Sequence, residues 1–171
     1  MSTRDLFIIR HAKSDWPQSV IRDFDRPLTN RGAKDAPLIA RWLGDQNLTP
    51  DLLISSPAQR AKQTAEAIIG QLEIPQQKIS FDKRLYLAST EILLNVMVEL
   101  EQDLTTVMLI GHNPGLENLI IHLSHDPLPY THDAKLLTTA NVVQLRFKSS
   151  WKSICPKQGR LINFIRPKDL Y

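Results

Sequence analysis

Histidine and arginine residues occur in three short polar clusters that could carry chemistry. The first cluster contains Arg10 and His11, the second contains Arg60, and the third contains His112. Arginine guanidinium groups keep their charge and bind phosphate oxygens in pairs, so Arg10 and Arg60 could clamp a phosphoryl group. An imidazole with an ordinary pKa of about 6.5 is largely neutral near pH 7, and a neutral imidazole can attack phosphorus. These residue types indicate phosphoryl transfer.

The two histidines could act in different protonation states. One imidazole would attack phosphorus, while the second, protonated, would stabilise the charge on the equatorial oxygens. A helix expected to begin near Pro114 would direct free backbone N–H groups toward the same anion. Each residue alone also fits a structural role, because single buried histidines are commonly hydrogen-bonded and surface arginines commonly pair with carboxylates. A phosphate site therefore requires that the fold bring all four side chains together.

Apolar runs directly before the clusters predict the strands that would position them. Leu6–Ile9, Leu52–Ile54 and Val107–Ile110 are wholly apolar, as is typical of strands covered on both faces. In open α/β sheets, ligands bind beyond the carboxyl ends of the strands. Each of the three strands ends just before one cluster, so we expect both histidines and both arginines to converge at one edge of the sheet.

Helical periods separate these strands. Apolar residues recur on a single face in segments 61–72, 93–100 and 116–123. A further helix is expected between Thr29 and Gln46, with Thr29 as its N-cap. Pro37 lies inside this segment and should kink the helix or delay its start to near Asp35. The alternation of strands and helices predicts parallel pairing through crossover helices.

The C-terminal third of the sequence has a different pattern. Val142–Phe147 and Arg160–Ile165 are strand-like and are separated by a polar segment, so we expect a strand pair that gives the sheet an antiparallel member. Residues 124–139 are expected to form a loop. The predicted fold class is α/β, a three-layer α/β/α sandwich with a mostly parallel mixed sheet. The length and the absence of a linker predict a single domain over residues 1–171.

Composition and charge exclude several classes of protein. The 21 basic and 18 acidic residues give a net charge of +3, and the basic residues are scattered, whereas nucleic-acid-binding proteins usually cluster them. Cys155 is the only cysteine, which excludes an internal disulfide framework and a thiolate metal cluster. No apolar run approaches the roughly 18 residues of a membrane span, and the one near the N-terminus is too short for a secretory signal. We expect a cytoplasmic protein that binds neither nucleic acid nor a membrane.

Four segments jointly resemble the histidine phosphatase superfamily, which includes the phosphoglycerate mutases. Segment 6–12 (LFIIRHA) is similar to the Arg-His-Gly signature, with Ala12 in place of glycine, and segment 28–32 (LTNRG) to the Leu-Thr-x-x-Gly segment that follows it. Segments 55–65 (SSPAQRAKQTA) and 111–115 (GHNPG) are similar to the second arginine motif and the second histidine. The length and the segments 10–16 (RHAKSDW) and 164–167 (FIRP) further resemble the SixA-type phosphohistidine phosphatases.

The resemblance implies a phosphoglycerate mutase-like fold without large insertions, and a role for each of the four residues. His11 would be the nucleophile that becomes phosphorylated, Arg10 and Arg60 would hold the phosphoryl group, and His112 would complete the pocket. No metal and no other cofactor is implied.

Several other polar residues have weaker roles or none. We expect Lys13, Ser14 and Asn113, in the same loops, to bind substrate. Ala12 lacks the easy access of glycine to positive φ, so we expect the loop to need none there. A second histidine-rich group fits no metal-ligand spacing, and a helix end and a polar loop explain it; its members are His122, His125, His132 and Asp126.

One departure from the family concerns the proton donor. Mutases and many relatives carry a glutamate after the third strand, in a Leu-x-Glu context, whereas this chain has Leu87 at that place. Either another carboxylate substitutes, with Asp15, Asp23 and Glu91 as candidates, or no strong donor is needed. An imidazole leaves phosphorus far more readily than an alkoxide, so a phosphohistidine substrate suits a site without an acid.

The function that the resemblance implies is a metal-independent phosphatase that works through a phosphohistidine enzyme intermediate. The expected substrate is a phosphohistidine-bearing signalling or phosphotransfer protein. The alternatives are a phosphatase of a small phosphorylated metabolite and a phosphate-binding module without catalysis. We expect a monomer or a weak dimer.

Overall fold

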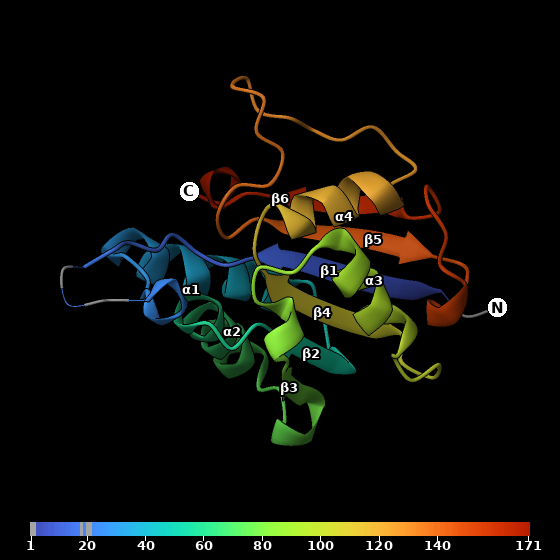
Figure 1. The fold of residues 1–171 in the computed structure, drawn as a ribbon, viewed down its shortest axis with the longest axis horizontal. Coiled ribbons are helices and arrows are strands. Elements are labelled where there is room, and N and C mark those ends of the chain that lie inside the picture. The colour runs from blue at the N-terminus through green and yellow to red at the C-terminus, as the bar shows by residue number, and fades with distance from the viewer. Residues whose placement is uncertain (1–2, 18, 20–21) are drawn as a thin grey trace.

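In the part of the chain that the structure describes, six strands form one mixed sheet. This computed structural model describes residues 3–17, 19 and 22–171. The strand order is β3-β2-β4-β1-β5-β6 (Figure 1). The strands are β1 (Arg4–Arg10), β2 (Leu52–Ser55), β3 (Ile79–Phe81), β4 (Thr106–Gly111), β5 (Val142–Phe147) and β6 (Arg160–Ile165).

Strand directions follow the predicted division of the sheet. The strands β1 to β4 pair in parallel, whereas β5 runs antiparallel to both β1 and β6. The predicted C-terminal strand pair is therefore confirmed. Strand β3 was not predicted, because it is a three-residue edge strand in which Ser80 and Phe81 are exposed and no apolar run marks it.

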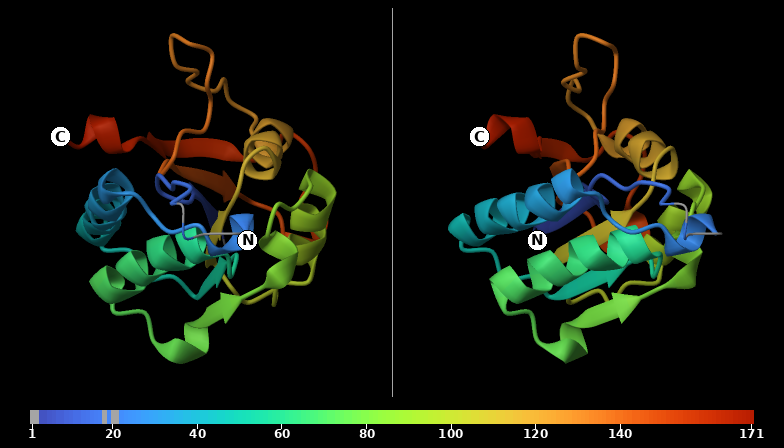
Figure 2. Two further views of the ribbon diagram at one scale, coloured as in Figure 1. Left: turned by 60° about the vertical axis from the view of Figure 1, so that its left-hand side comes forward. Right: turned by 90° about the vertical axis from the view of Figure 1, so that its left-hand side faces the viewer.

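Helices cover both faces of the sheet, which confirms the predicted three-layer α/β/α sandwich (Figure 2). They are α1 (Asn30–Asp45), α2 (Gln59–Leu72), α3 (Thr90–Val98) and α4 (Gly115–Leu123). Helices α1 and α2 pack around Phe7 and Ile9 of β1, and α3 and α4 pack around Leu6 and Ile8. Successive strand residues point to opposite faces, so the apolar run Leu6–Ile9 within β1 contributes to both cores.

Helix α1 begins directly after Thr29. Thr29 is its N-cap, as predicted, and the Thr29 Oγ1 accepts a hydrogen bond from a first-turn backbone N–H at 3.0 Å. The helix starts at Asn30 and includes Pro37, so the predicted delay to near Asp35 is wrong. The first turn is held from outside, because the backbone N–H and the hydroxyl of Thr29 both donate to the Lys13 carbonyl, at 2.8 and 3.2 Å. This contact fixes the start of α1 against the loop that follows β1.

Residues 124–139 form the expected loop between α4 and β5, which projects from the sheet (Figure 1). Its first residue, Ser124, makes an isolated bridge to Gly159. None of the helices within the described ranges is both long enough and apolar enough to cross a membrane.

Candidate active site

The two histidines meet where two neighbouring parallel strands end. Arg10 at the end of β1 is in register with Gly111 at the end of β4, so the next residues of both strands, His11 and His112, leave the sheet side by side. Their ring centroids are 5.1 Å apart, and both residues are buried. The predicted convergence at this sheet edge is therefore seen in the structure.

Arg60 and a backbone carbonyl set the orientation of His11. Arg60 lies in the first turn of α2 and is buried, and its Nε donates to the His11 Nε2 at 3.3 Å. The His11 Nδ1 is 2.7 Å from the carbonyl oxygen of Ala12. A carbonyl only accepts, so Nδ1 carries the proton of the neutral ring and Nε2 keeps its lone pair. This tautomer presents Nε2 as the nucleophilic atom.

Burial keeps both histidines neutral in the ligand-free site. Desolvation lowers the pKa of His11 to about 3; the hydrogen bond to Ala12 opposes this, and the nearby arginines reinforce it. Burial also lowers the pKa of His112 to about 3, and the neighbouring His11 is the second cause. His112 is therefore neutral in the ligand-free site, because burial outweighs the usual tendency of histidine to ionise. The predicted protonated second imidazole concerns the site with a bound phosphoryl group and stays a prediction. A neutral His11 is available for attack throughout the physiological pH range.

His112 is held by a serine that the sequence did not single out. The His112 Nε2 lies 2.8 Å from the Ser56 Oγ, which follows β2. The His112 Nδ1 is buried and has no hydrogen-bond partner among the described residues. The Tyr86 ring stands edge-on to the His112 ring, with centroids 5.6 Å apart. His112 thus offers one nitrogen that is not committed within the protein.

Arg10 is anchored by the loop before β5. Its Nη1 donates to the Leu137 carbonyl at 2.8 Å. Its Nε is buried without a hydrogen-bond partner among the described residues. Burial lowers the pKa of Arg10, and the negative charge of Glu117 opposes this. Arginine keeps its charge even so, and the site therefore contains two guanidinium groups beside two neutral imidazoles.

Asp23 belongs to the site and binds Arg60 directly. It begins a 3-10 helix, Asp23–Asp25, and its Oδ2 accepts hydrogen bonds from the Arg60 Nη2 at 2.9 Å and the Tyr86 hydroxyl at 2.7 Å. Burial alone would raise the pKa of Asp23, but these donors and Arg26 outweigh it and hold the pKa well below the usual range. Asp23 is therefore a carboxylate near neutral pH, and it does not fit the role of proton donor.

The other two candidate donors lie at the surface. Asp15 is exposed, and its Oδ1 accepts a hydrogen bond from the Trp16 backbone N–H at 2.8 Å. Glu91 is exposed in the first turn of α3. The Leu87 side chain is 55% exposed, so the place of the family's glutamate is open to solvent here.

The three expected substrate-binding residues are placed differently from one another. Ser14 is buried, and its Oγ accepts a hydrogen bond from the Arg26 Nη2 at 3.0 Å. Asn113 uses its amide nitrogen to bind Glu117 and the Leu137 carbonyl, at 3.2 and 3.0 Å. The Lys13 side chain is exposed. Ser14 and Asn113 thus support the loops around the site, and Lys13 is the one with a free side chain at the surface.

Ala12 fits its place without a left-handed backbone, as predicted, since it is absent from the described residues that have positive φ. It is fully buried, and its backbone N–H donates to the Thr64 Oγ1 at 3.0 Å. The Thr64 hydroxyl in turn donates to the Arg60 carbonyl at 2.8 Å. This pair of hydrogen bonds links the loop that carries His11 to the helix that carries Arg60.

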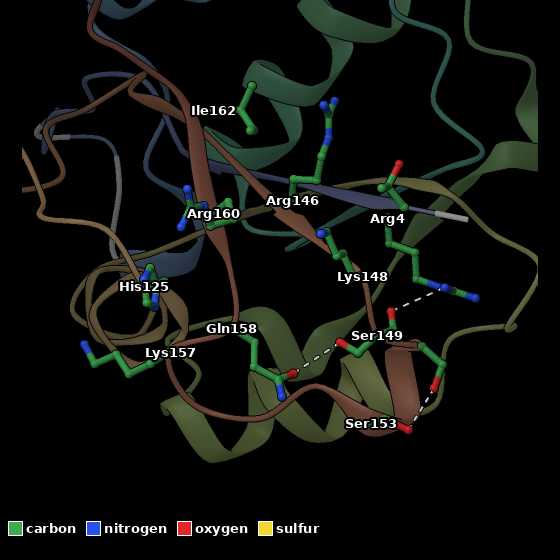
Figure 3. A pocket seen from close by; sticks show the side chains of 12 residues that line it. Arg4, His125, Arg146, Lys148, Ser149, Ser153, Lys157, Gln158, Arg160 and Ile162 are labelled. Carbon is green, nitrogen blue, oxygen red and sulfur yellow. Dashed lines mark hydrogen bonds between the residues drawn. The ribbon is translucent and has the colours of Figure 1, made fainter. Parts of the chain in front are cut away.

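A groove away from the two histidines lies at the amino end of β1 (Figure 3). It has a volume of about 1150 Å³, and its basic side chains include Arg146, Lys148 and Arg160. These side chains point in different directions (Figure 3). Arg146 is already bound by Asp5 through two hydrogen bonds of 2.8 and 3.0 Å. Within the described residues, no three His, Cys, Asp or Glu side chains are grouped to hold a metal ion.

Comparisons with known proteins identify relatives of the whole chain. A family model described as histidine phosphatase superfamily (branch 1) matches residues 6–86. An uncharacterized protein of Mycobacterium tuberculosis is 30% identical over 164 residues, which cover 94% of this chain and all of that protein. Phosphohistidine phosphatase SixA of Escherichia coli is 36% identical over 70 residues, or 41% of this chain and 42% of SixA. The structure of a protein histidine phosphatase SixA complexed with tungstate has a TM-score of 0.81 at 22% identity, and covers 98% of this chain and 99% of that one.

Proposed function

The chain belongs to the histidine phosphatase superfamily, and from this premise we propose that it removes phosphate from phosphohistidine on a protein. One observation carries the proposal. The His11 Nε2 is unprotonated, because Nδ1 is held by the Ala12 carbonyl, and its lone pair accepts a hydrogen bond of 3.3 Å from the Arg60 Nε, which a phosphoryl group would replace. This is the arrangement that a nucleophilic imidazole requires.

The first half of the reaction transfers the phosphoryl group to His11. The Nε2 lone pair attacks phosphorus, a P–N bond forms, and the bond between phosphorus and the substrate imidazole breaks with its electron pair going to that imidazole. Arg10 and Arg60 bind the phosphoryl oxygens and stabilise the charge that develops on them. The phosphorylated His11 ring gains positive charge, which its Nδ1–H shares with the Ala12 carbonyl at 2.7 Å.

The second half of the reaction returns the enzyme to its starting state. A water oxygen attacks the phosphorus of the phosphohistidine, the P–N bond to the His11 Nε2 breaks with its electron pair going back to Nε2, and both protons of the water stay on the phosphate. Inorganic phosphate leaves, and His11 becomes neutral again. The uncommitted Nδ1 of His112, which can donate a hydrogen bond in one neutral tautomer, is the second imidazole contact to the phosphoryl oxygens.

The state of the carboxylates supports a phosphohistidine substrate. An alkoxide leaving group needs a proton donor, and Asp23, the carboxyl group beside Arg60, stays ionised. A substrate imidazole that carries a proton on its other nitrogen leaves as a neutral molecule and needs no such donor. The absence of a glutamate at Leu87 is consistent with the same substrate.

The proposal is tested by measuring phosphate release, without added metal, from a histidine-phosphorylated carrier protein. The same assay is run with a phosphorylated sugar, with His11→Ala and with His132→Ala, an exposed histidine that serves as the matched control. We expect rapid release from the carrier, unchanged in His132→Ala and reduced at least about a thousandfold in His11→Ala. Preference for the sugar would make the protein a metabolite phosphatase with the same site. Binding of vanadate without release from either substrate would indicate a phosphate-binding module.

A further inference from the structure

We propose that Glu117 is a positioning residue that orients the Arg10 guanidinium through the peptide group of Leu137. The inference rests on the proposed function, in which Arg10 holds the phosphoryl group. It concerns the direction in which that guanidinium points.

Glu117 and Arg10 both form hydrogen bonds to the backbone of Leu137, one to its N–H and the other to its carbonyl. The Glu117 Oε2 accepts a hydrogen bond from the Leu137 backbone N–H at 3.0 Å, and the Leu137 carbonyl accepts one from the Arg10 Nη1 at 2.8 Å. Asn113 joins the two contacts, because its Nδ2 lies 3.2 Å from the Glu117 Oε2 and 3.0 Å from the Leu137 oxygen. The backbone of one loop residue therefore connects a carboxylate on α4 to an arginine at the end of β1.

This connection matters because Leu137 lies in the long loop between α4 and β5. The loop has no helix to hold its backbone, so its conformation depends on such tethers. The side chains of Leu136 and Leu137 are buried in the core beside α4. Buried side chains fix the place of these residues, and the Glu117 hydrogen bond fixes the rotation of the backbone that aims the Leu137 carbonyl at Arg10.

Arg166 tethers the other side of the same loop. Its Nη2 donates to the Leu136 carbonyl at 3.1 Å and to the Pro129 carbonyl, and its guanidinium stacks on the Phe164 ring. The Phe164–Pro167 segment, which the sequence singled out without a function, thus holds the loop. Glu117 accepts the hydrogen bond from the Leu137 backbone N–H, and its negative charge also acts on the Arg10 guanidinium.

A misdirected Arg10 would still carry its charge, but its remaining donors would miss the phosphoryl oxygens. The Leu137 carbonyl is the hydrogen-bond acceptor that the described residues offer to this guanidinium. Without the Glu117 contact, the Leu137 peptide can rotate and the guanidinium can follow it. Misplacement of a catalytic group by about 1 Å costs up to about a hundredfold in rate.

The test is a double-mutant cycle that joins Glu117→Ala and Arg10→Ala, measured by kcat/KM and by vanadate affinity. Glu117→Ala is expected to lower both about ten- to a hundredfold in the wild-type background, and by less than about threefold in the Arg10→Ala background. Glu117→Gln should restore most of the activity, because its amide oxygen can accept both hydrogen bonds. Glu66→Ala, an exposed glutamate on α2, is the matched control and should change neither quantity.

The outcomes separate this inference from the proposed function. Two results would overturn the positioning role and leave the proposed function standing. One is that Glu117→Ala lowers kcat/KM and vanadate affinity equally in both backgrounds. The other is that Glu117→Ala lowers neither quantity, although Arg10→Ala is strongly impaired. Full activity of Arg10→Ala would instead remove Arg10 from the proposed mechanism. Should Glu117→Ala not fold, Glu117→Asp keeps the charge but withdraws the oxygen by one methylene, and the same cycle applies to it.

Discussion

Lowering the pH from 7 to 5 is expected to destabilise the fold through its buried histidines. In the unfolded chain His11 takes up a proton with its ordinary pKa of about 6.5. Burial lowers the pKa of His11 in the folded protein to about 3, so the folded state stays unprotonated at pH 5. The unfolded state therefore binds more protons than the folded state over this range, and the free energy of unfolding falls as the pH falls.

The size of the effect follows from the distance between the pH and the unfolded-state pKa. Each pKa unit corresponds to about 1.36 kcal/mol, so about 1.5 units at pH 5 give a loss of about 2 kcal/mol for His11. His112 has a similarly lowered pKa of about 3 and adds a comparable amount. Together they would remove about 4 kcal/mol, a large part of the roughly 5–15 kcal/mol that stabilises a typical domain. The loss continues until the pH reaches about 3, where the folded protein also becomes protonated.

Urea unfolding at pH 7 and pH 5, followed by the fluorescence of the buried Trp151, measures this loss. In His11→Gln the free energy of unfolding should fall less between pH 7 and pH 5 than in the wild type, by about 2 kcal/mol. His132→Gln replaces an exposed histidine and should leave the difference unchanged. If the wild type and His11→Gln lose the same free energy, His11 is not held neutral and the proposed nucleophile loses its physical basis.

Two further predictions concern the supports of the site. Gly32→Ala would place a methyl group 2.1 Å from the Lys13 carbonyl oxygen and should lower the free energy of unfolding by more than about 2 kcal/mol. Gly70→Ala, whose added methyl group has nothing within 4 Å, should raise it by about 0.5–1 kcal/mol. Thermal unfolding of both variants tests this, and similar melting temperatures would contradict the close approach at Gly32. Ser56→Ala removes the 2.8 Å hydrogen bond to His112 and the 3.3 Å hydrogen bond from the Ala58 N–H, so it should lower kcat/KM about tenfold and also lower the melting temperature. Unaltered kinetics would show that this serine does not orient the imidazole.

The elements that position the site could be predicted because their signals are local. The apolar run Leu6–Ile9 marks a strand covered on both faces, and the residues after it are placed at the sheet edge by the geometry of parallel strands. Pro37 misled the prediction for α1, because local propensity indicated a late start. The contact of Thr29 with the Lys13 carbonyl, which determines the actual start, joins two distant segments.

The contacts within the site could not be predicted, because they depend on where loops pack. Asp23 was named only as a candidate proton donor, because nothing local indicates that its carboxylate reaches Arg60 from 37 positions away. The lowered pKa of His112 has the same origin, since it comes from burial in the assembled fold. The spacing of Asn113 and Glu117 was a usable signal, because side chains four residues apart at the start of a helix can touch.

The central position of β1 has a consequence for how the protein is made. Ile9 pairs with Ile110 on one side and with Val142 on the other, so β1 can pair only after two strands that are synthesised later. At roughly 5–20 residues per second, about 5–20 seconds pass on the ribosome before β4 follows β1. During that interval an apolar strand has neither neighbour, and it is a natural binding site for chaperones. Contacts of such long sequence separation also slow refolding, so His11 and His112 meet late in folding, after most of the chain has been synthesised.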